Sequence, residues 1–139
     1  MSRFLQRLSN AAAAGSPLIN TRTGTVVAEV LEAAINQRAR RKGLLGRTAL
    51  AERHALILAP CNAIHTFGMK FPIDVVFIGP DGCVVKIVER LARRRIAVSW
   101  DACATVELAA GSARRADIAV GDRLAIETPA ALDTAVNAR

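Results

Sequence analysis

The chain has few aromatic residues, few histidines and few cysteines. Aromatic side chains make up 4% of its 139 residues, and there are 2 histidines and 3 cysteines. Proteins that bind single-stranded nucleic acid usually stack bases on aromatic side chains, so this composition argues against that class. His54 and His65 form no HxH or HExxH pattern. We therefore expect no metal site.

Long apolar runs and phosphate-binding loops are also absent from the sequence. No run of about 18 apolar residues is free of charge, which excludes a membrane-spanning helix. The glycines form neither a GxGxxG nor a GxxxxGK[ST] pattern, so we expect no nucleotide and no other cofactor. Arg7 interrupts the short apolar stretch near the N-terminus, which is unlike a secretory leader. These absences favour a cytoplasmic protein.

The cysteines are odd in number and form no CxxC pair. A disulfide framework would use an even number, so the pattern predicts free thiols in a reducing compartment. Each cysteine lies beside apolar residues and suits the role of a small buried hydrophobe. Cys61 lies four residues before His65, which leaves a catalytic thiol open as the less favoured alternative.

Positive charge is in excess. The chain has 19 lysines and arginines against 12 acidic residues, which gives a formal net charge of +7. Such a balance keeps a small protein soluble, and it would also suit an anionic partner such as nucleic acid. The basic clusters are Arg38, Arg40, Arg41, Lys42 and Arg47; Arg90, Arg93, Arg94 and Arg95; and Arg114 with Arg115. Only clusters that share one face would form an anion-binding surface, and the sequence leaves their placement open.

Hydrophobic residues make up 52% of the chain, which is enough for one core and excludes disorder of the whole chain. Apolar and β-branched runs predict short strands, and one basic run predicts a helix that ends at Gly43. The expected strands are 25–31, 54–59, 73–78, 83–88, 105–108 and 123–127, and the expected helix is 33–42. Most gaps between these strands are too short for a crossover helix.

The sequence therefore predicts a mostly β (α+β) fold. We expect a small barrel-like sheet, antiparallel or mixed, with one or two short helices, in a single globular domain over residues 17–128. Residues 1–16 offer little large apolar surface, so we expect a flexible arm that folding does not require. Residues 129–139 are expected to form a flexible tail.

Five short motifs occur in order along the chain. They are KGLLGR at 42–47, HTFGMKFPIDVVFI at 65–78, GPDGCVVKI at 79–87, TVELAAG at 105–111 and VGDRL at 120–124. In this combination the chain resembles the family called domain of unknown function 192, over residues 24–127. The resemblance implies a small, mostly β domain, and it carries over no catalytic residue because that family has no assigned activity. Many relatives have a secretory leader or lipoprotein anchor, and many have a tryptophan near the position of Phe67.

Residues 65–74 carry the candidate site. His65 and Thr66 can bind a ligand through imidazole and hydroxyl groups, while Phe67 and Met69 suit either a pocket wall or the core. Asp74 lies within an apolar strand, so its carboxyl must be paired or hydrogen-bonded.

Asp74 has two alternative roles. It is either a structural tie to an arginine or to backbone N–H groups, or a general acid or base. Arg47 and His65 are its candidate partners in either role. Glu107 lies in a similar setting, but strand alternation allows its side chain to point outward.

The leading hypothesis is an accessory domain without enzymatic activity that binds a small polar ligand or a protein in a cleft around residues 65–74. The first alternative is an enzyme that uses Asp74 and His65 as an acid–base pair. The second is a basic module associated with nucleic acid, which we favour less. We expect no membrane partner.

Overall fold

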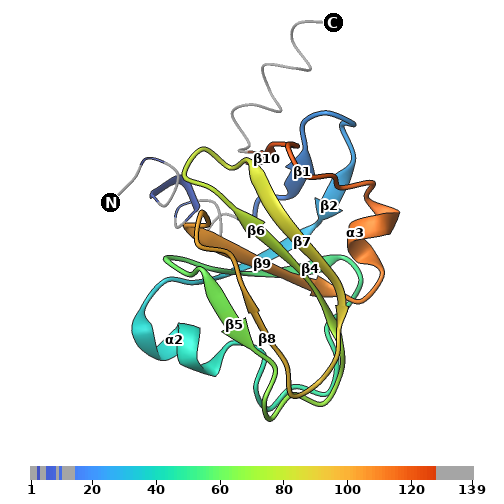
Figure 1. Ribbon diagram of the computed structural model, residues 1–139. Helices are drawn as coiled ribbons and strands as arrows, with labels where there is room; N and C mark the ends of the chain where they lie inside the picture. The colour runs from blue at the N-terminus through green and yellow to red at the C-terminus, as the bar shows by residue number, and fades with distance from the viewer. Residues whose placement is uncertain (1–2, 4–5, 9, 11–14, 128–139) are drawn as a thin grey trace, which may run out of the picture.

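A mixed five-stranded sheet forms the centre of the molecule (Figure 1). The computed structural model describes residues 3, 6–8, 10 and 15–127. The strands of the sheet, in spatial order, are β3 (Val30–Ala34), β4 (His54–Leu58), β9 (Ala104–Ala109), β6 (Ile73–Ile78) and β7 (Val84–Leu91). β3 and β4 run parallel, and the helix α2 (Gln37–Lys42) lies in the connection between them. The other neighbouring pairs are antiparallel.

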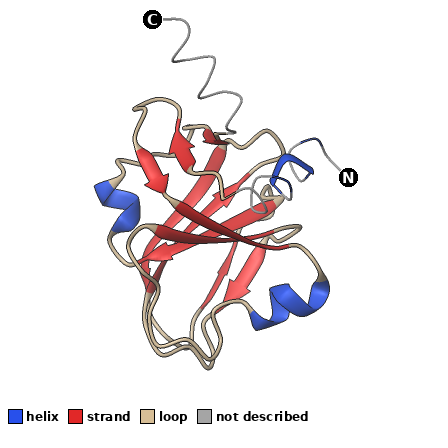
Figure 2. Cartoon of the chain, turned by 180° about the vertical axis from the view of Figure 1, so that it is seen from behind, coloured by secondary structure: helices blue, strands red, loops and turns tan. Residues whose placement is uncertain are grey.

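Two smaller sheets, the helix α3 (Ser112–Arg115) and the helical residues 3, 6–8 and 10 near the N-terminus complete the described fold (Figure 2). One sheet has the order β10 (Leu124–Ile126), β1 (Leu18–Asn20) and β2 (Val26–Ala28), and the other pairs β5 (Ala63–His65) with β8 (Ile96–Val98). The short helix α3 follows β9. The expected mostly β (α+β) class and the mixed sheet are confirmed. The sheet is open among the described strands, with β3 and β7 as its two edges.

Both faces of β6, an inner strand of the central sheet, are buried. Side chains alternate along β6, so Val76 and Ile78 pack in one apolar cluster while Val75 and Phe77 pack in another. A strand that is covered on both faces needs an almost continuous apolar sequence. This explains why IDVVFI gives the clearest strand pattern in the chain.

Some boundaries of the strands and of the helix α2 differ from the expected ones. The expected strand 25–31 is interrupted at Glu29, and its second half continues as β3 to Ala34. The helix starts later than expected, because the Asn36 side chain accepts a hydrogen bond from the N–H of Ala39 at 2.8 Å and caps its first turn. The three-residue strands β1, β5 and β8 were not anticipated, since such short segments show little periodicity.

The β6–β7 hairpin matches the expected turn. The backbone N–H of Gly82 donates to the carbonyl of Gly79 at 3.0 Å, and Gly82 has a φ of 86°. Glycine adopts this left-handed conformation without steric cost. The Asp81 carboxylate accepts from the N–H of Cys83 at 3.1 Å and so supports the same turn.

The expected N-terminal arm can be compared with the structure in part, and the expected C-terminal tail cannot. Leu8, within the expected N-terminal arm, is fully buried and belongs to the cluster that also contains Leu18 and Leu124. This core contact was not anticipated. The expected tail 129–139 lies outside the described residues.

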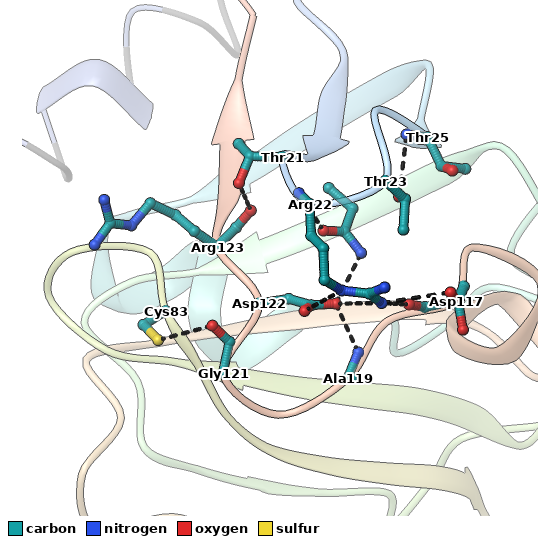
Figure 3. A network of polar contacts seen from close by, with 11 residues as sticks. Thr21, Arg22, Thr23, Thr25, Cys83, Asp117, Ala119, Gly121, Asp122 and Arg123 are labelled. Carbon is teal, nitrogen blue, oxygen red and sulfur yellow. Dashed lines mark hydrogen bonds and ion pairs between the residues drawn. The ribbon is translucent and has the colours of Figure 1, made fainter.

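A polar network fastens the β1–β2 hairpin to the segment before β10 (Figure 3). The Arg22 guanidinium contacts the Asp122 carboxylate at 2.7 Å, and the Asn20 amide donates to the same carboxylate at 2.9 Å. The hydrogen bond from Arg22, a further one from the N–H of Ala119 and the charge of Arg22 hold the pKa of Asp122 well below its usual value. The network is therefore a structural tie.

Candidate functional site

A pocket of about 380 Å³ lies between α2 and the neighbouring ends of the sheet. Arg40, Arg41 and Lys42 of α2 form one side, and β5 with the segment that precedes it forms another. Its apolar lining includes Leu44, Ile64 and Met69, which are buried in the second apolar cluster. This volume is at the small end of the range for ligand-binding pockets.

Glu107 is the acidic residue of this pocket lining. It lies in β9 between Leu56 on β4 and Val75 on β6, so its side chain points to the face that α2 covers. Only 4% of the residue is exposed, and its Oε2 atom has no hydrogen-bond partner among the described residues. Burial raises the pKa of Glu107 to about 7, although the charge of Arg47 acts in the opposite direction.

Arg40 is held at the edge of the pocket by two backbone carbonyls. Its Nη1 donates to the carbonyl of Ile35, just after β3, and to that of Ala59, just after β4, at 3.3 Å for the latter. Its Nε and Nη2 donate to no acceptor in the part of the chain that the structure describes. The half-buried guanidinium is thus fixed in position and keeps donors free.

Two of the predicted site residues, His65 and Met69, line the pocket. Phe67 lies outside this lining, half exposed, with its ring centroid 5.8 Å from that of His65. Thr66 is fully buried, and its hydroxyl donates to the carbonyl of Ala92 at 2.7 Å and accepts from the N–H of Arg95 at 2.9 Å. Thr66 therefore holds the loop after β7 against β5.

Asp74 lies on the other face of the sheet. Its Oδ1 accepts from the N–H of Arg90 at 2.9 Å, and its Oδ2 accepts from the N–H groups of Gly111 at 3.0 Å and Ala113 at 2.9 Å. Arg90 has a φ of 49° and Gly111 one of 93°, so the carboxylate supports two left-handed backbone positions. No hydrogen bond within the described residues joins Asp74 to His65 or to Arg47.

Arg47 forms an ion pair with Glu32 and not with Asp74, the partner expected from the sequence. Its Nη1 donates to Oε2 of Glu32 at 2.7 Å. Glu32, Leu56 and Glu107 are lateral neighbours on β3, β4 and β9, so Arg47 lies over the same face as the pocket. This arrangement explains its electrostatic effect on Glu107.

The basic clusters do not share one face. α2, with Arg40 and its neighbours, and α3, with Arg114 and Arg115, lie on opposite sides of the central sheet in both views (Figures 1 and 2). The described residues contain no group of three or more metal-ligating side chains. Among them there is also no helix long and apolar enough to cross a membrane.

Sequence reasoning missed Glu107 and Arg40 as site residues. The signal for Glu107 was an acidic residue within the apolar run TVEL, but alternation alone did not show which face of β9 would be covered. Arg40 was one of several arginines in α2, and nothing in the sequence distinguished it from Arg38.

The fold and the site define a small α+β domain with a ligand-sized pocket between a basic helix and an open sheet. The chain belongs to the DUF192 family, described as "Uncharacterized ACR", whose sequence model matches residues 18–126. This confirms the resemblance seen in the motifs. A comparison with curated proteins finds no match.

Two solved structures are similar to the chain. One is a candidate transcription regulator from Sinorhizobium meliloti 1021, with 25% identity and a TM-score of 0.68, covering 79% of this chain and 90% of that one. The other is a protein of unknown function from Novosphingobium aromaticivorans DSM 12444, with 22% identity and a TM-score of 0.65, covering 83% and 96%. The second likeness shows the fold alone.

Proposed function

We propose that the protein is a binding domain for a small polar ligand, which lies in the pocket between α2 and the sheet and contacts Glu107. The observation that carries this proposal is the buried carboxyl of Glu107, a residue of the pocket lining whose Oε2 has no partner among the described residues. An unpaired buried polar group costs about 1–3 kcal/mol. A ligand that donates a hydrogen bond to this oxygen would remove that cost.

The pocket also accounts for part of the cleft expected around residues 65–74. His65 and Met69 contribute to it, whereas Thr66 holds the loop after β7 and Asp74 binds backbone N–H groups on the opposite face of the sheet. The proposed binding function therefore depends on the face of the sheet that α2 covers.

A pocket-filling variant tests the proposal for any small ligand. Ala63 lines the pocket and is exposed, so Ala63→Phe should occupy part of it, while Ala51→Phe adds the same ring to an exposed position outside it. Small molecules extracted from the purified wild-type protein and both variants are compared by mass spectrometry. A compound bound by the wild type and Ala51→Phe, and lost from Ala63→Phe, is the expected result. Identical extracts from all three proteins would overturn the proposal.

A second candidate function is acid–base catalysis at the same pocket, with Glu107 in the role that the sequence had suggested for Asp74. A pKa of about 7 is suited to proton transfer at neutral pH. Conversion of the bound compound by the wild type, and not by Glu107→Gln, would favour this candidate over binding alone.

Binding to nucleic acid is supported less well. The net charge of +7 suits it, and so does the description of the similar protein from Sinorhizobium meliloti as a candidate transcription regulator. The separation of α2 and α3 opposes it, since a continuous basic face is the usual footprint. Fluorescence anisotropy with labelled duplex DNA at physiological salt should show no saturable binding.

A further inference from the structure

We propose that the pocket binds a small zwitterion, with Arg40 contacting its carboxylate and Glu107 contacting its protonated amine. This inference rests on the proposed function, because it names the ligand class of that same pocket. An amino acid is the simplest molecule of this class.

The anionic end of the ligand is inferred from Arg40. Two backbone carbonyls fix one nitrogen of its guanidinium, and the donors on Nε and Nη2 lack acceptors within the described residues. These donors have the parallel geometry that binds both oxygens of a carboxylate. Because the protein already holds the side chain in place, little rotamer freedom is lost on binding.

The cationic end of the ligand is inferred from Glu107. A protonated amine supplies several donors for the Glu107 carboxylate, and its charge favours the ionised form of that group. The pKa of about 7 means that little free energy is needed to ionise this group at neutral pH. The apolar lining of Leu44, Ile64 and Met69 suits the carbon atoms of such a ligand.

A ligand with only one of these groups fits the lining less well. A simple carboxylate would pair with Arg40 but leave Glu107 without a donor. A simple amine would reach Glu107 but meet Arg40, Arg41 and Lys42, none of which forms an ion pair with a described residue. Both ends are satisfied when the ligand carries both charges.

The experiment uses the standard L-amino acids as probes, each compared with the carboxylic acid that lacks its amine and the amine that lacks its carboxylate. Thermal shift identifies binders, and isothermal titration calorimetry measures their affinity for the full chain. Arg40→Lys keeps the charge but removes the fork of donors, and Glu107→Gln keeps the size but removes the negative charge. Arg38→Lys and Glu52→Gln are matched controls at exposed positions outside the pocket.

We expect at least one amino acid to bind the wild type, and its two partial analogues to bind about tenfold more weakly or worse. Arg40→Lys and Glu107→Gln should each weaken binding by a similar factor, and the two controls should leave it unchanged. A carboxylic acid that binds as well as its amino acid, with no loss in Glu107→Gln, would overturn the inference.

The two proposals can fail separately. If no amino acid binds, but the extraction experiment finds another compound that Ala63→Phe loses, the zwitterion inference is wrong and the proposed binding function stands. If neither experiment finds a molecule that depends on the pocket, both proposals are wrong.

Discussion

Glu107 lies opposite Val75 across the β6–β9 pair, whereas Asp74 lies opposite Leu108. Neighbouring residues of a strand point to opposite faces, so the two buried carboxyl groups are separated by the sheet. The packing agrees, because Val75 belongs to the cluster under α2 and Leu108 to the cluster on the other side. Two acidic residues in similar apolar strands therefore have different surroundings. One has three hydrogen bonds from backbone N–H groups, and the other borders a pocket.

The first prediction concerns stability and pH at Glu107. Its pKa of about 7 in the folded protein is above the ordinary value of 4.5. The stabilising contribution of the protonated form is fully present below pH 4.5 and is lost as pH rises through 7. The free energy of unfolding of the wild type should therefore fall by up to about 3 kcal/mol between pH 5 and pH 9. Glu107→Gln should not show this fall.

Urea denaturation at several pH values measures this effect. The difference in unfolding free energy between wild type and Glu107→Gln should grow between pH 4.5 and pH 7 and level off above pH 7. Parallel pH profiles for the two proteins would show that Glu107 ionises normally in the fold.

The second prediction concerns acid stability at Asp122. Its pKa is lowered in the folded protein by the hydrogen bond from Arg22, with further help from Ala119 and Asn20. The stabilising contribution of this carboxylate is present above its unfolded pKa near 4 and is lost as pH falls below that value. Asp122→Asn should therefore be less stable than the wild type at pH 7, and the gap should narrow in acid. Thermal unfolding from pH 7 to pH 2 measures the difference in stability between the variant and the wild type. Asp101→Asn, at an exposed position, is the control.

The long apolar strands and their hairpin were predictable from sequence because burial on both faces leaves a strong pattern. IDVVFI and the glycine-rich turn at 79–82 are the clearest examples. The pairing of β3 with β4 in parallel was not predictable, since it depends on α2 crossing between them. Local composition does not show which strands become neighbours.

The candidate site was only partly predictable for the same reason. His65 lines the pocket at the end of β5, which pairs with β8, a contact between segments that are far apart in the chain. Arg40 becomes distinct from Arg38 only when the carbonyls of Ile35 and Ala59 meet at the end of two parallel strands. Such roles follow from tertiary contacts, which no single motif encodes.

The third prediction concerns Leu8 in the N-terminal segment. Its side chain is fully buried with the first apolar cluster, so Leu8→Ala should lower the unfolding free energy by about 2–4 kcal/mol. Gln6→Ala, an exposed position in the same segment, should change it little. Chemical denaturation of both variants, and of a chain that starts at Pro17, measures the contribution. A Leu8→Ala protein as stable as the wild type would restore the expectation that residues 1–16 are dispensable.

The last prediction separates Asp74 from His65. Removal of the Asp74 carboxylate leaves the N–H groups of Arg90, Gly111 and Ala113 without their acceptor inside the protein. Each unpaired group carries a desolvation cost, so Asp74→Ala should lose about 3 kcal/mol of stability or more. His65 is exposed and its ring makes no hydrogen bond to a described residue. His65→Ala should therefore be nearly as stable as the wild type and should weaken binding in the pocket.

Urea denaturation and the amino-acid titrations, carried out on both variants, test this separation. Asp74→Asn is the informative intermediate, because its amide oxygen can still accept one or two of the three hydrogen bonds while its NH₂ group faces the remaining N–H groups. Its stability should therefore fall between those of the wild type and Asp74→Ala. If Asp74→Ala were as stable as the wild type but no longer converted a compound that the wild type converts, the Asp74 carboxylate would be catalytic. The acid–base role would then belong to Asp74 and not to Glu107.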